Sequence, residues 1–284
     1  VPEFGAESFY EACQSFWFVQ MLIQTEASGH SISPGRFDRY MYPYYKADLD
    51  KGDITRAEAQ ELIDCIWVKL NDLNKVRDAA SAEGFAGYSL FQNLIVGGQD
   101  ESGIDTTNDL SFMCITASMH VALPQPSLSI RVWNGSPYEL LAHAARLTRT
   151  GIGLPAYYND EVIIPSLMSR GLTLEDARDY NIIGCVEPQK SGKTDGWHDA
   201  AFFNMCRPLE LVFSNGVDEG EQISIQTGDV EKMSSFEEFY DAYKKQMNYM
   251  IELLVNADNA IDTAHGVRCP LPFVSSMVDD CIER

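Results

Sequence analysis

The sequence predicts an α/β fold in which strands alternate with helices. Short apolar runs typical of strands stand between longer segments whose apolar residues recur at helical spacing. The 284 residues are 45% hydrophobic and 22% charged, a composition that supports one sizeable core. Strands separated by helices become parallel neighbours, so the pattern favours a barrel or a doubly wound sheet. No internal repeat or linker divides the chain, and we expect a single region over residues 1–284.

Helices dominate the first half of the predicted order. Apolar spacing predicts an opening helix over residues 9–28, and a capping box predicts another over residues 55–78. Residues 30–45 between them are polar and aromatic without helical period and are predicted to be a loop. Residues 88–96 are predicted to form a short strand or a helix end, and a helix is predicted over residues 107–123.

Alternation is clearest in the second half. Strands are predicted at residues 128–133, at 153–158 and in the apolar run that leads to Cys185. The predicted helices cover residues 136–150, two short segments that begin at Asn159 and Thr173, and residues 200–215 and 235–264.

Charge and hydropathy exclude several classes of protein. The 21 Lys and Arg residues against 42 Asp and Glu give a net charge of −21, which disfavours nucleic acid or an anionic membrane as a partner. No apolar run reaches 18 residues, and the first residues do not resemble a signal peptide, so the expected location is the cytoplasm. The seven cysteines are scattered and never spaced as in zinc or iron–sulfur sites, so no metal site of these kinds is expected.

The most informative motif sets a thiol and a carboxylate two residues apart. If the apolar run that includes Cys185 and Glu187 is a strand, both side chains point to one face. Pro188 cannot donate to a sheet and is expected to end that strand. The pair would then lie at a carboxyl end, where open α/β sheets and barrels place their chemistry.

Two common chemistries do not fit this motif. A phosphate-binding loop around residues 191–194 needs a glycine where the chain has Glu187, whose charge would repel phosphate. A hydrolytic Cys185, with His198 as base, is disfavoured because an adjacent carboxylate raises the pKa of a thiol. A cysteine beside a base is better explained if its hydrogen atom is used, which points to radical chemistry.

These residues resemble a known family. The segment from Gly184 to Asn204 is similar to the thiyl-radical segment of glycyl radical enzymes, in the glycerol and diol dehydratase branch of the pyruvate formate-lyase superfamily. Further similar segments are residues 29–38, 97–100, 105–111 and 125–131.

The resemblance implies a ten-stranded α/β barrel that encloses two finger loops, one with the cysteine and the other with the radical-bearing glycine. Cys185 would become the thiyl radical that abstracts hydrogen from a substrate carbon. Glu187 would act as general base on the adjacent hydroxyl. The pyruvate formate-lyases carry two adjacent cysteines, but here Gly184 precedes Cys185, which argues against acyl transfer.

The resemblance also implies a substrate-binding set. His30 and Asp199 match positions that grip the substrate hydroxyls and help to protonate the departing water. Ser31 lies beside His30 in the sequence, and Phe91 matches an aromatic position that lines the pocket. Other charged residues are interpreted as members of structural ion pairs, namely Arg36, Arg131 and Asp109.

The glycyl-radical motif of the family is absent from the sequence, so we expect an internal piece of a longer enzyme. The resemblance then implies that a radical-SAM activating enzyme installs the radical on a segment outside this chain, and that the barrel itself holds no metal or bound organic cofactor. A homodimer is the expected assembly. The expected activity is dehydration of a small 1,2-diol, such as glycerol or propane-1,2-diol, to an aldehyde. The alternatives are hydroxyproline dehydration, C–S cleavage, choline C–N cleavage, or an inactive barrel piece with a structural role.

Overall fold

A computed structural model describes the chain in two compact units. One comprises Val1–Gly196 with Leu271–Arg284, and the other comprises Trp197–Pro270. The expectation of one region over the whole chain stays a prediction. No helix within the described residues is long and apolar enough to cross a membrane. The described residues are 3–27, 31–74, 79–84, 90–193 and 203–278.

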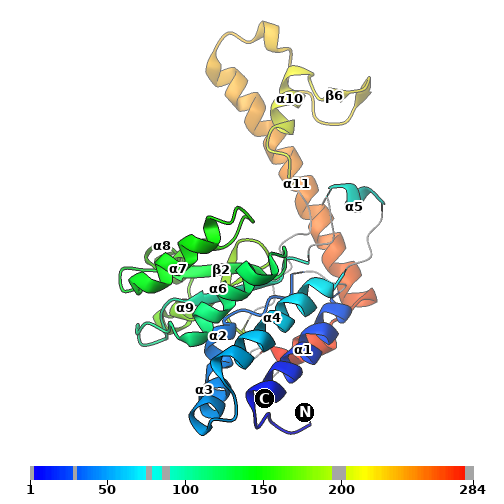
Figure 1. Ribbon diagram of the computed structural model, residues 1–284. Coiled ribbons are helices and arrows are strands. Elements are labelled where there is room, and N and C mark those ends of the chain that lie inside the picture. The colour runs from blue at the N-terminus through cyan, green and yellow to red at the C-terminus, as the bar shows by residue number, and fades with distance from the viewer. Residues whose placement is uncertain (1–2, 28–30, 75–78, 85–89, 194–202, 279–284) are drawn as a thin grey trace. The chain divides into compact units, whose positions relative to one another are not determined.

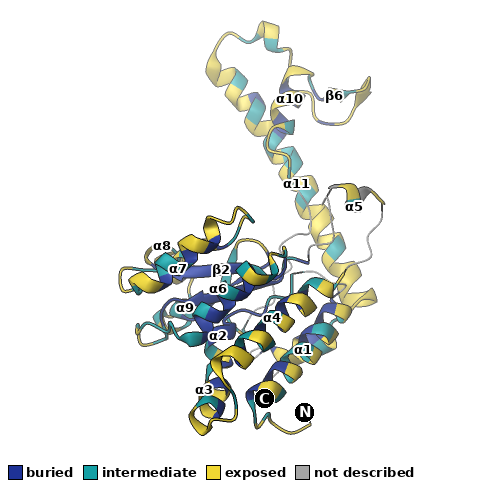
Figure 2. Cartoon of the chain, viewed as in Figure 1, coloured by how far each residue is buried: buried dark blue, intermediate teal, exposed yellow. Residues whose placement is uncertain are grey.

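A three-stranded parallel sheet forms the centre of the first unit (Figure 1). Its strands lie in the order β1 (Asn93–Gly97), β2 (Ser127–Val132) and β3 (Ala156–Asn159). Helix α6 (Asp109–Val121) connects β1 to β2, and α7 (Tyr138–Thr148) connects β2 to β3. This arrangement confirms the predicted alternation of parallel strands with helices. Strand β1 is buried along its whole length, and Figure 2 shows β2 among the buried elements.

The main core lies between this sheet and helices from the first half of the chain. Helix α1 (Phe9–Glu26) begins where Ser8 Oγ accepts the backbone N–H of Glu11, at 3.2 Å. The predicted capping box of Thr55 and Glu58 is present at α4 (Arg56–Asp72), which ends earlier than residue 78. Fully buried members of this core include Phe9, Phe37, Tyr45, Ile63, Trp67, Leu70, Leu94 and Leu110.

The prediction of a loop over residues 30–45 is wrong from residue 37 onward. Helix α2 (Phe37–Tyr40) and helix α3 (Tyr42–Lys51) occupy this stretch. Their aromatic side chains do not recur at helical spacing because two short helices divide the segment. Burial of Phe37 and Tyr45 in the core holds these helices in place.

An antiparallel hairpin carries the thiol and carboxylate motif. It follows α8 (Asp160–Ser169) and α9 (Leu174–Arg178), whose predicted caps Asn159 and Thr173 are confirmed. The hairpin strands are β4 (Tyr180–Ile183) and β5 (Glu187–Lys190).

The predicted end of the strand at Pro188 is wrong. Pro188 lies within β5 and pairs with Ile182 of β4. A two-stranded hairpin has an outer edge on each strand, and proline is tolerated where no ladder bond is required. The apolar strand instead ends at Ile183, and the chain turns through residues 184–186.

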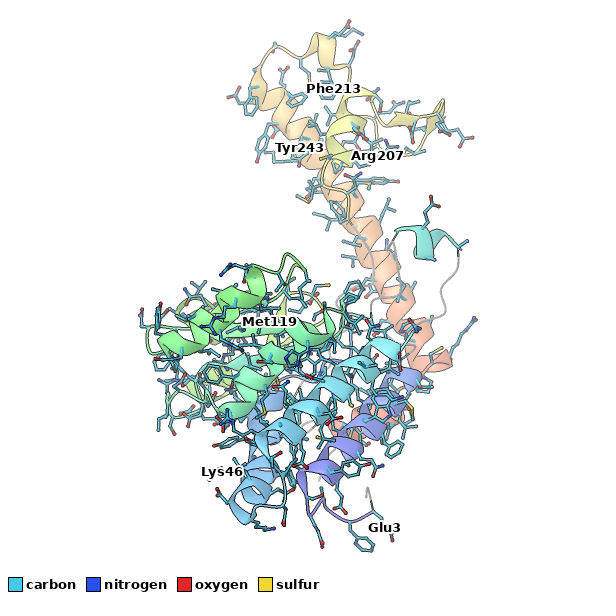
Figure 3. The ribbon with its side chains drawn as sticks, viewed as in Figure 1. Glu3, Lys46, Met119, Arg207, Phe213 and Tyr243 are labelled. Atoms are coloured by element: carbon cyan, nitrogen blue, oxygen red, sulfur yellow. The ribbon has the colours of Figure 1, made fainter. Side chains whose placement is uncertain are left out.

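The second unit contains α10 (Arg207–Phe213), the short strands β6 (Val217–Asp218) and β7 (Glu221–Gln222), and the long helix α11 (Phe236–Arg268). The predicted helix over residues 235–264 is confirmed. The one predicted over residues 200–215 is shorter, since described residues 203–206 are not helical. Phe213 and Tyr243, labelled in Figure 3, belong to the two main helices of this unit. The remaining short element of this unit is η1 (Val230–Lys232). The first unit also contains the short helices α5 (Ala79–Gly84) and α12 (Pro272–Met277).

Candidate active site

Cys185 lies at the tip of the hairpin, in the turn between β4 and β5, and its side chain is exposed. The prediction that Cys185 and Glu187 share one face of a strand is therefore wrong, because only Glu187 belongs to a strand. The two residues are brought together by the turn itself. Glu187 Oε2 accepts the backbone N–H of Val186 at 2.8 Å, so its carboxylate points back toward the tip.

The Glu187 carboxylate and the Ser31 hydroxyl both lie close to Gly184. Its φ is +61°, a conformation that favours glycine. A Cβ at this position would lie 3.1 Å from Glu187 Oε2 and 3.2 Å from Ser31 Oγ. The absence of a side chain therefore leaves room for Ser31 and Glu187 to converge immediately beside Cys185.

Ser33 connects the segment after residue 30 to the hairpin. Its Oγ accepts the backbone N–H groups of Gly184 and Asn93, each at 3.0 Å. The same hydroxyl lies 2.9 Å from the carbonyl of Ser31 and 3.4 Å from that of Phe91, either of which it can donate to. One hydroxyl thus links β1, the hairpin tip and two residues expected to bind substrate.

Ser31 and Phe91 are held side by side by backbone contacts. Ser31 N–H donates to the carbonyl of Leu90 at 2.9 Å. Both Ser31 and Phe91 have positive φ, at +61° and +54°, which is strained for residues with a Cβ. Such strain is typical of functional segments that the surrounding structure fixes. The other two expected binding residues, His30 and Asp199, lie outside the described residues, as does His198.

Tyr158 is a residue at this site that the sequence did not single out. It lies near the carboxyl end of β3, and its Oη donates to the carbonyl oxygen of Cys185 at 2.8 Å. Burial, followed by the nearby charge of Glu187, raises the pKa of Tyr158. The hydroxyl therefore stays protonated and able to donate. Its place at the carboxyl end of a parallel strand was the available signal.

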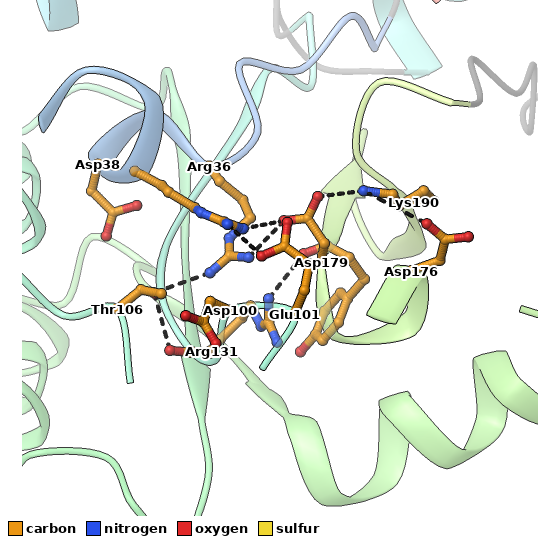
Figure 4. Close-up of polar contacts among 12 residues, drawn as sticks. Arg36, Asp38, Asp100, Glu101, Thr106, Arg131, Asp176, Asp179 and Lys190 are labelled. Atoms are coloured by element: carbon orange, nitrogen blue, oxygen red, sulfur yellow. Dashed lines mark hydrogen bonds and ion pairs between the residues drawn. The ribbon is translucent and has the colours of Figure 1, made fainter. Parts of the chain in front are cut away.

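Charged residues fix the base of the hairpin (Figure 4). Asp179, just before β4, accepts from Arg36 at 2.8 Å and from Arg39 at 2.6 Å. Lys190 at the end of β5 also pairs with Asp179 and reaches Asp176 at 4.0 Å. These contacts join the hairpin to α2 and the segment before it.

A second ion pair lies deeper, under the start of β4. Arg131 from β2 and Asp160 from α8 are fully buried and form two parallel hydrogen bonds of 2.8 Å. Tyr180 donates to Asp160 at 2.8 Å, and its ring lies 4.0 Å from the guanidinium carbon of Arg131. The structural interpretation of Arg36 and Arg131 agrees with these contacts, as does that of Asp109, which pairs with Arg56 at 2.7 Å.

The site uses hydrogen-bonding side chains and a thiol. Within the described ranges, no group of three or more His, Cys, Asp or Glu side chains is placed to hold a metal ion. A thiol beside a carboxylate and a hydroxyl can exchange a hydrogen atom and accept a proton at the same place. This is the pair of functions that a radical dehydration requires.

Solved structures with the same fold are close in sequence. A structure described as "1,2-propanediol Dehydration in Roseburia inulinivorans" is 76% identical, with a TM-score of 0.97 over 99% of this chain and 35% of that chain. The glycerol-bound B12-independent glycerol dehydratase from Clostridium butyricum is 63% identical, with a TM-score of 0.93 over 98% of this chain and 35% of that chain. Among curated proteins, (2S)-3-sulfopropanediol dehydratase of Klebsiella oxytoca is 38% identical.

The chain spans about a third of the curated relatives it matches. The sulfopropanediol dehydratase match covers 97% of this chain and 34% of that protein. The neighbours include glycyl radical enzymes, so the α/β barrel class and the resemblance deduced from the sequence are confirmed. The family described as "Pyruvate formate lyase-like" matches residues 1–284. The chain therefore belongs to the pyruvate formate lyase-like family.

Proposed function

We propose that the protein containing this chain dehydrates a small 1,2-diol, glycerol or propane-1,2-diol, to an aldehyde and water. The observation that carries the proposal is the convergence of the Glu187 carboxylate and the Ser31 hydroxyl at Gly184, next to Cys185. High identity to proteins named for glycerol and 1,2-propanediol dehydration supports the choice of a diol.

Cys185 performs the hydrogen transfers. A glycyl radical on a segment outside this chain takes a hydrogen atom from the Cys185 thiol, so that the S–H bond breaks, a C–H bond forms on the glycine and the unpaired electron is left on the sulfur. The sulfur then takes a hydrogen atom from the diol carbon, so that a C–H bond breaks and an S–H bond forms. After water has left, Cys185 returns a hydrogen atom to the product radical and the sulfur regains its unpaired electron.

Glu187 performs the proton transfer. A carbon radical makes its own hydroxyl far more acidic than that of the parent alcohol, so a carboxylate within reach can remove the proton. The deprotonated radical then expels the hydroxyl group of the neighbouring carbon. The C–O bond breaks, and this hydroxyl gains a proton and leaves as water. In sum, one diol gives one aldehyde and one water, with no net oxidation or reduction.

The remaining residues bind and orient the diol. Ser31 supplies a hydroxyl on the same side as Glu187, and Phe91 supplies an apolar wall. His30 and Asp199 grip the substrate hydroxyls and protonate the departing group. A radical-SAM activating enzyme is the proposed macromolecular partner, and the enzyme acts as a homodimer.

The test uses the full-length protein, activated anaerobically by a radical-SAM activase with S-adenosylmethionine and a reductant. The C185A variant should lose aldehyde production from glycerol and propane-1,2-diol completely. The E187Q variant should lower kcat about 100-fold or more, the usual contribution of a general base. Both variants should keep the glycyl radical signal in electron paramagnetic resonance, because neither changes the glycine.

Matched controls are available within the described residues. The E161Q variant alters a carboxylate that also accepts a backbone N–H, from Asn134 at 2.8 Å, on the segment that follows β2. The C206A variant removes another exposed cysteine. Both controls should keep wild-type kcat. Substrates for the test include hydroxyproline, isethionate and choline, and turnover of any of these without turnover of diols would refute the diol assignment.

A further inference from the structure

The peptide group between Cys185 and Val186 is held from two sides. Its carbonyl oxygen accepts the Tyr158 hydroxyl at 2.8 Å, and its N–H donates to Glu187 Oε2 at 2.8 Å. In a trans peptide the oxygen and the N–H point in opposite directions. Rotation of this group about the Cα–C bond of Cys185 would therefore break both hydrogen bonds.

This peptide group matters because it is attached to the α-carbon that carries the thiol. Gly184, on the other side of Cys185, is tied through its N–H to Ser33. Within the described residues, Val186 of this turn is 64% exposed, so other side chains of this chain pack little against it. Within this chain, hydrogen bonds to side chains therefore fix the backbone on both sides of the thiol.

The two hydrogen bonds to this peptide group do not keep the same strength during turnover. Under the proposed function, on which this step rests, Glu187 takes up a proton from the substrate. A charged acceptor forms hydrogen bonds roughly twice as strong as those of a neutral one, so protonation weakens the tie to Val186. The hydrogen bond from Tyr158 to the Cys185 carbonyl involves no group that titrates at neutral pH, so it stays intact.

Tyr158 is itself rigidly placed. Its backbone pairs with Arg131 of β2, and its ring packs against the cluster that includes Ile95 and Ile182. The sheet and the packed ring thus fix the position of the Tyr158 hydroxyl more firmly than that of a mobile surface side chain.

We propose that Tyr158 is a positioning residue that holds the Cys185 peptide group, and through it the thiol, while Glu187 is protonated. The hydroxyl acts on the backbone of Cys185 and does not contact substrate. Its loss should therefore affect hydrogen transfer more than substrate binding.

The experiment compares Y158F with wild type in the full-length activated enzyme, with rates expressed per glycyl radical. We expect kcat to fall about 10- to 100-fold, the effect of misplacing a reacting group by about 1 Å. KM should change less than threefold. The deuterium isotope effect on kcat, measured with substrate deuterated at the reacting carbon, should rise because hydrogen transfer becomes more rate-limiting.

The matched control is Y157F, on the same strand. The Tyr157 hydroxyl pairs with Thr148 Oγ1 at 2.8 Å, away from the hairpin tip. This variant should retain wild-type kcat and isotope effect.

Three outcomes would overturn the proposal. One is a Y158F enzyme with kcat within twofold of wild type, and another is a reduced kcat with an unchanged isotope effect. The third is loss of folding or of the glycyl radical in Y158F, which would make the role structural. Failure of the proposed function is separate, because it would appear as activity in C185A or as no turnover of diols by the wild type.

Discussion

Gly184 shows how one missing side chain organises the site. A residue with a Cβ at φ of +61° is destabilised by about 1–2 kcal/mol relative to glycine. A methyl group there would also press on Glu187 and Ser31, at 3.1 and 3.2 Å. We expect G184A to lower kcat more than 100-fold in the full-length activated enzyme, because the carboxylate and hydroxyl would be displaced from the thiol.

Gly192 offers a control that separates the loss of stability in G184A from its loss of kcat. It has a similar φ of +70°, but a Cβ added there would meet no atom within 4 Å. The G192A variant should therefore share the loss of stability and keep its kcat. Equal kcat values in the two variants would contradict the assignment of the space beside Gly184 to substrate chemistry.

Individual site residues could be predicted from the sequence where a local motif or the resemblance to the family marks them. Cys185 and Glu187 stand two positions apart, and their neighbours carried the resemblance to the family. Tyr158 and Ser33 act on the same turn from 27 and 151 positions away, as their hydrogen bonds to Cys185 and Gly184 show. Apart from the place of Tyr158 at the end of a predicted strand, nothing local in the sequence marks these contacts, because they depend on the approach of distant segments.

At the scale of elements, the hairpin depends on the charges at its base. Burial alone would raise the pKa of Asp179, but the hydrogen bond from Lys190 and the charge of Arg36 outweigh it and lower this pKa. The unfolded chain then binds a proton at Asp179 at a higher pH than the folded chain does. Stability from this group is present above its unfolded pKa of about 3.9 and is lost as pH falls through the lower folded pKa.

We therefore expect the melting temperature of the protein to fall as the pH is lowered below about 4, partly through Asp179. The D179N variant should melt lower than wild type at pH 7, because Arg36 loses its partner, and should change less over the acid range. Scanning calorimetry at a series of pH values measures both effects.

The control for this prediction is D72N, which removes a carboxylate that is 60% exposed. Its melting temperature should parallel that of wild type at every pH. An acid dependence in D179N as steep as that of wild type would contradict the role given to Asp179.

Elements were predicted best where local signals define their ends. The caps at Thr55, Asn159 and Thr173 are each followed by a helix, as expected from their side-chain hydrogen bonds. The turn at residues 184–186 and helices α2 and α3 were missed. Their conformations depend on tertiary contacts, namely the hydroxyl of Ser33 and the burial of Phe37 and Tyr45.

At the scale of the whole molecule, the chain leaves the first unit after the hairpin and returns to it at α12. Glu26, at the end of α1, accepts the backbone N–H groups of Phe273 and Val274 at 3.1 and 2.8 Å. These bonds join residues almost 250 positions apart. Hydrogen bonds to a charged group contribute about 1.5–3 kcal/mol each.

We expect E26A to increase amide hydrogen exchange in residues 272–277 at least tenfold, because the start of α12 loses both acceptors. Exchange measured by mass spectrometry on the full-length protein gives this value. The E252A variant, which alters an exposed carboxylate on α11, should leave the same peptides unchanged. Unchanged exchange in E26A would mean that packing alone holds α12.

The α/β class and its parallel strands followed from composition and alternation alone. Two features of the whole chain could not be predicted in this way. The compact unit over Trp197–Pro270 and the return of Leu271–Arg284 depend on contacts between distant segments, which no local pattern encodes.

The buried pair of Arg131 and Asp160 has a consequence for the order of folding. Its members come from β2 and α8, and Tyr180 of β4 completes their hydrogen bonds. A buried charge that has lost its partner destabilises a protein by about 3–5 kcal/mol. A slip of β2 by one residue would turn Arg131 to the opposite face of the sheet and leave Asp160 alone. Correct strand register is therefore a condition for docking the hairpin, and a misassembled sheet would not hold Cys185 at the hairpin tip.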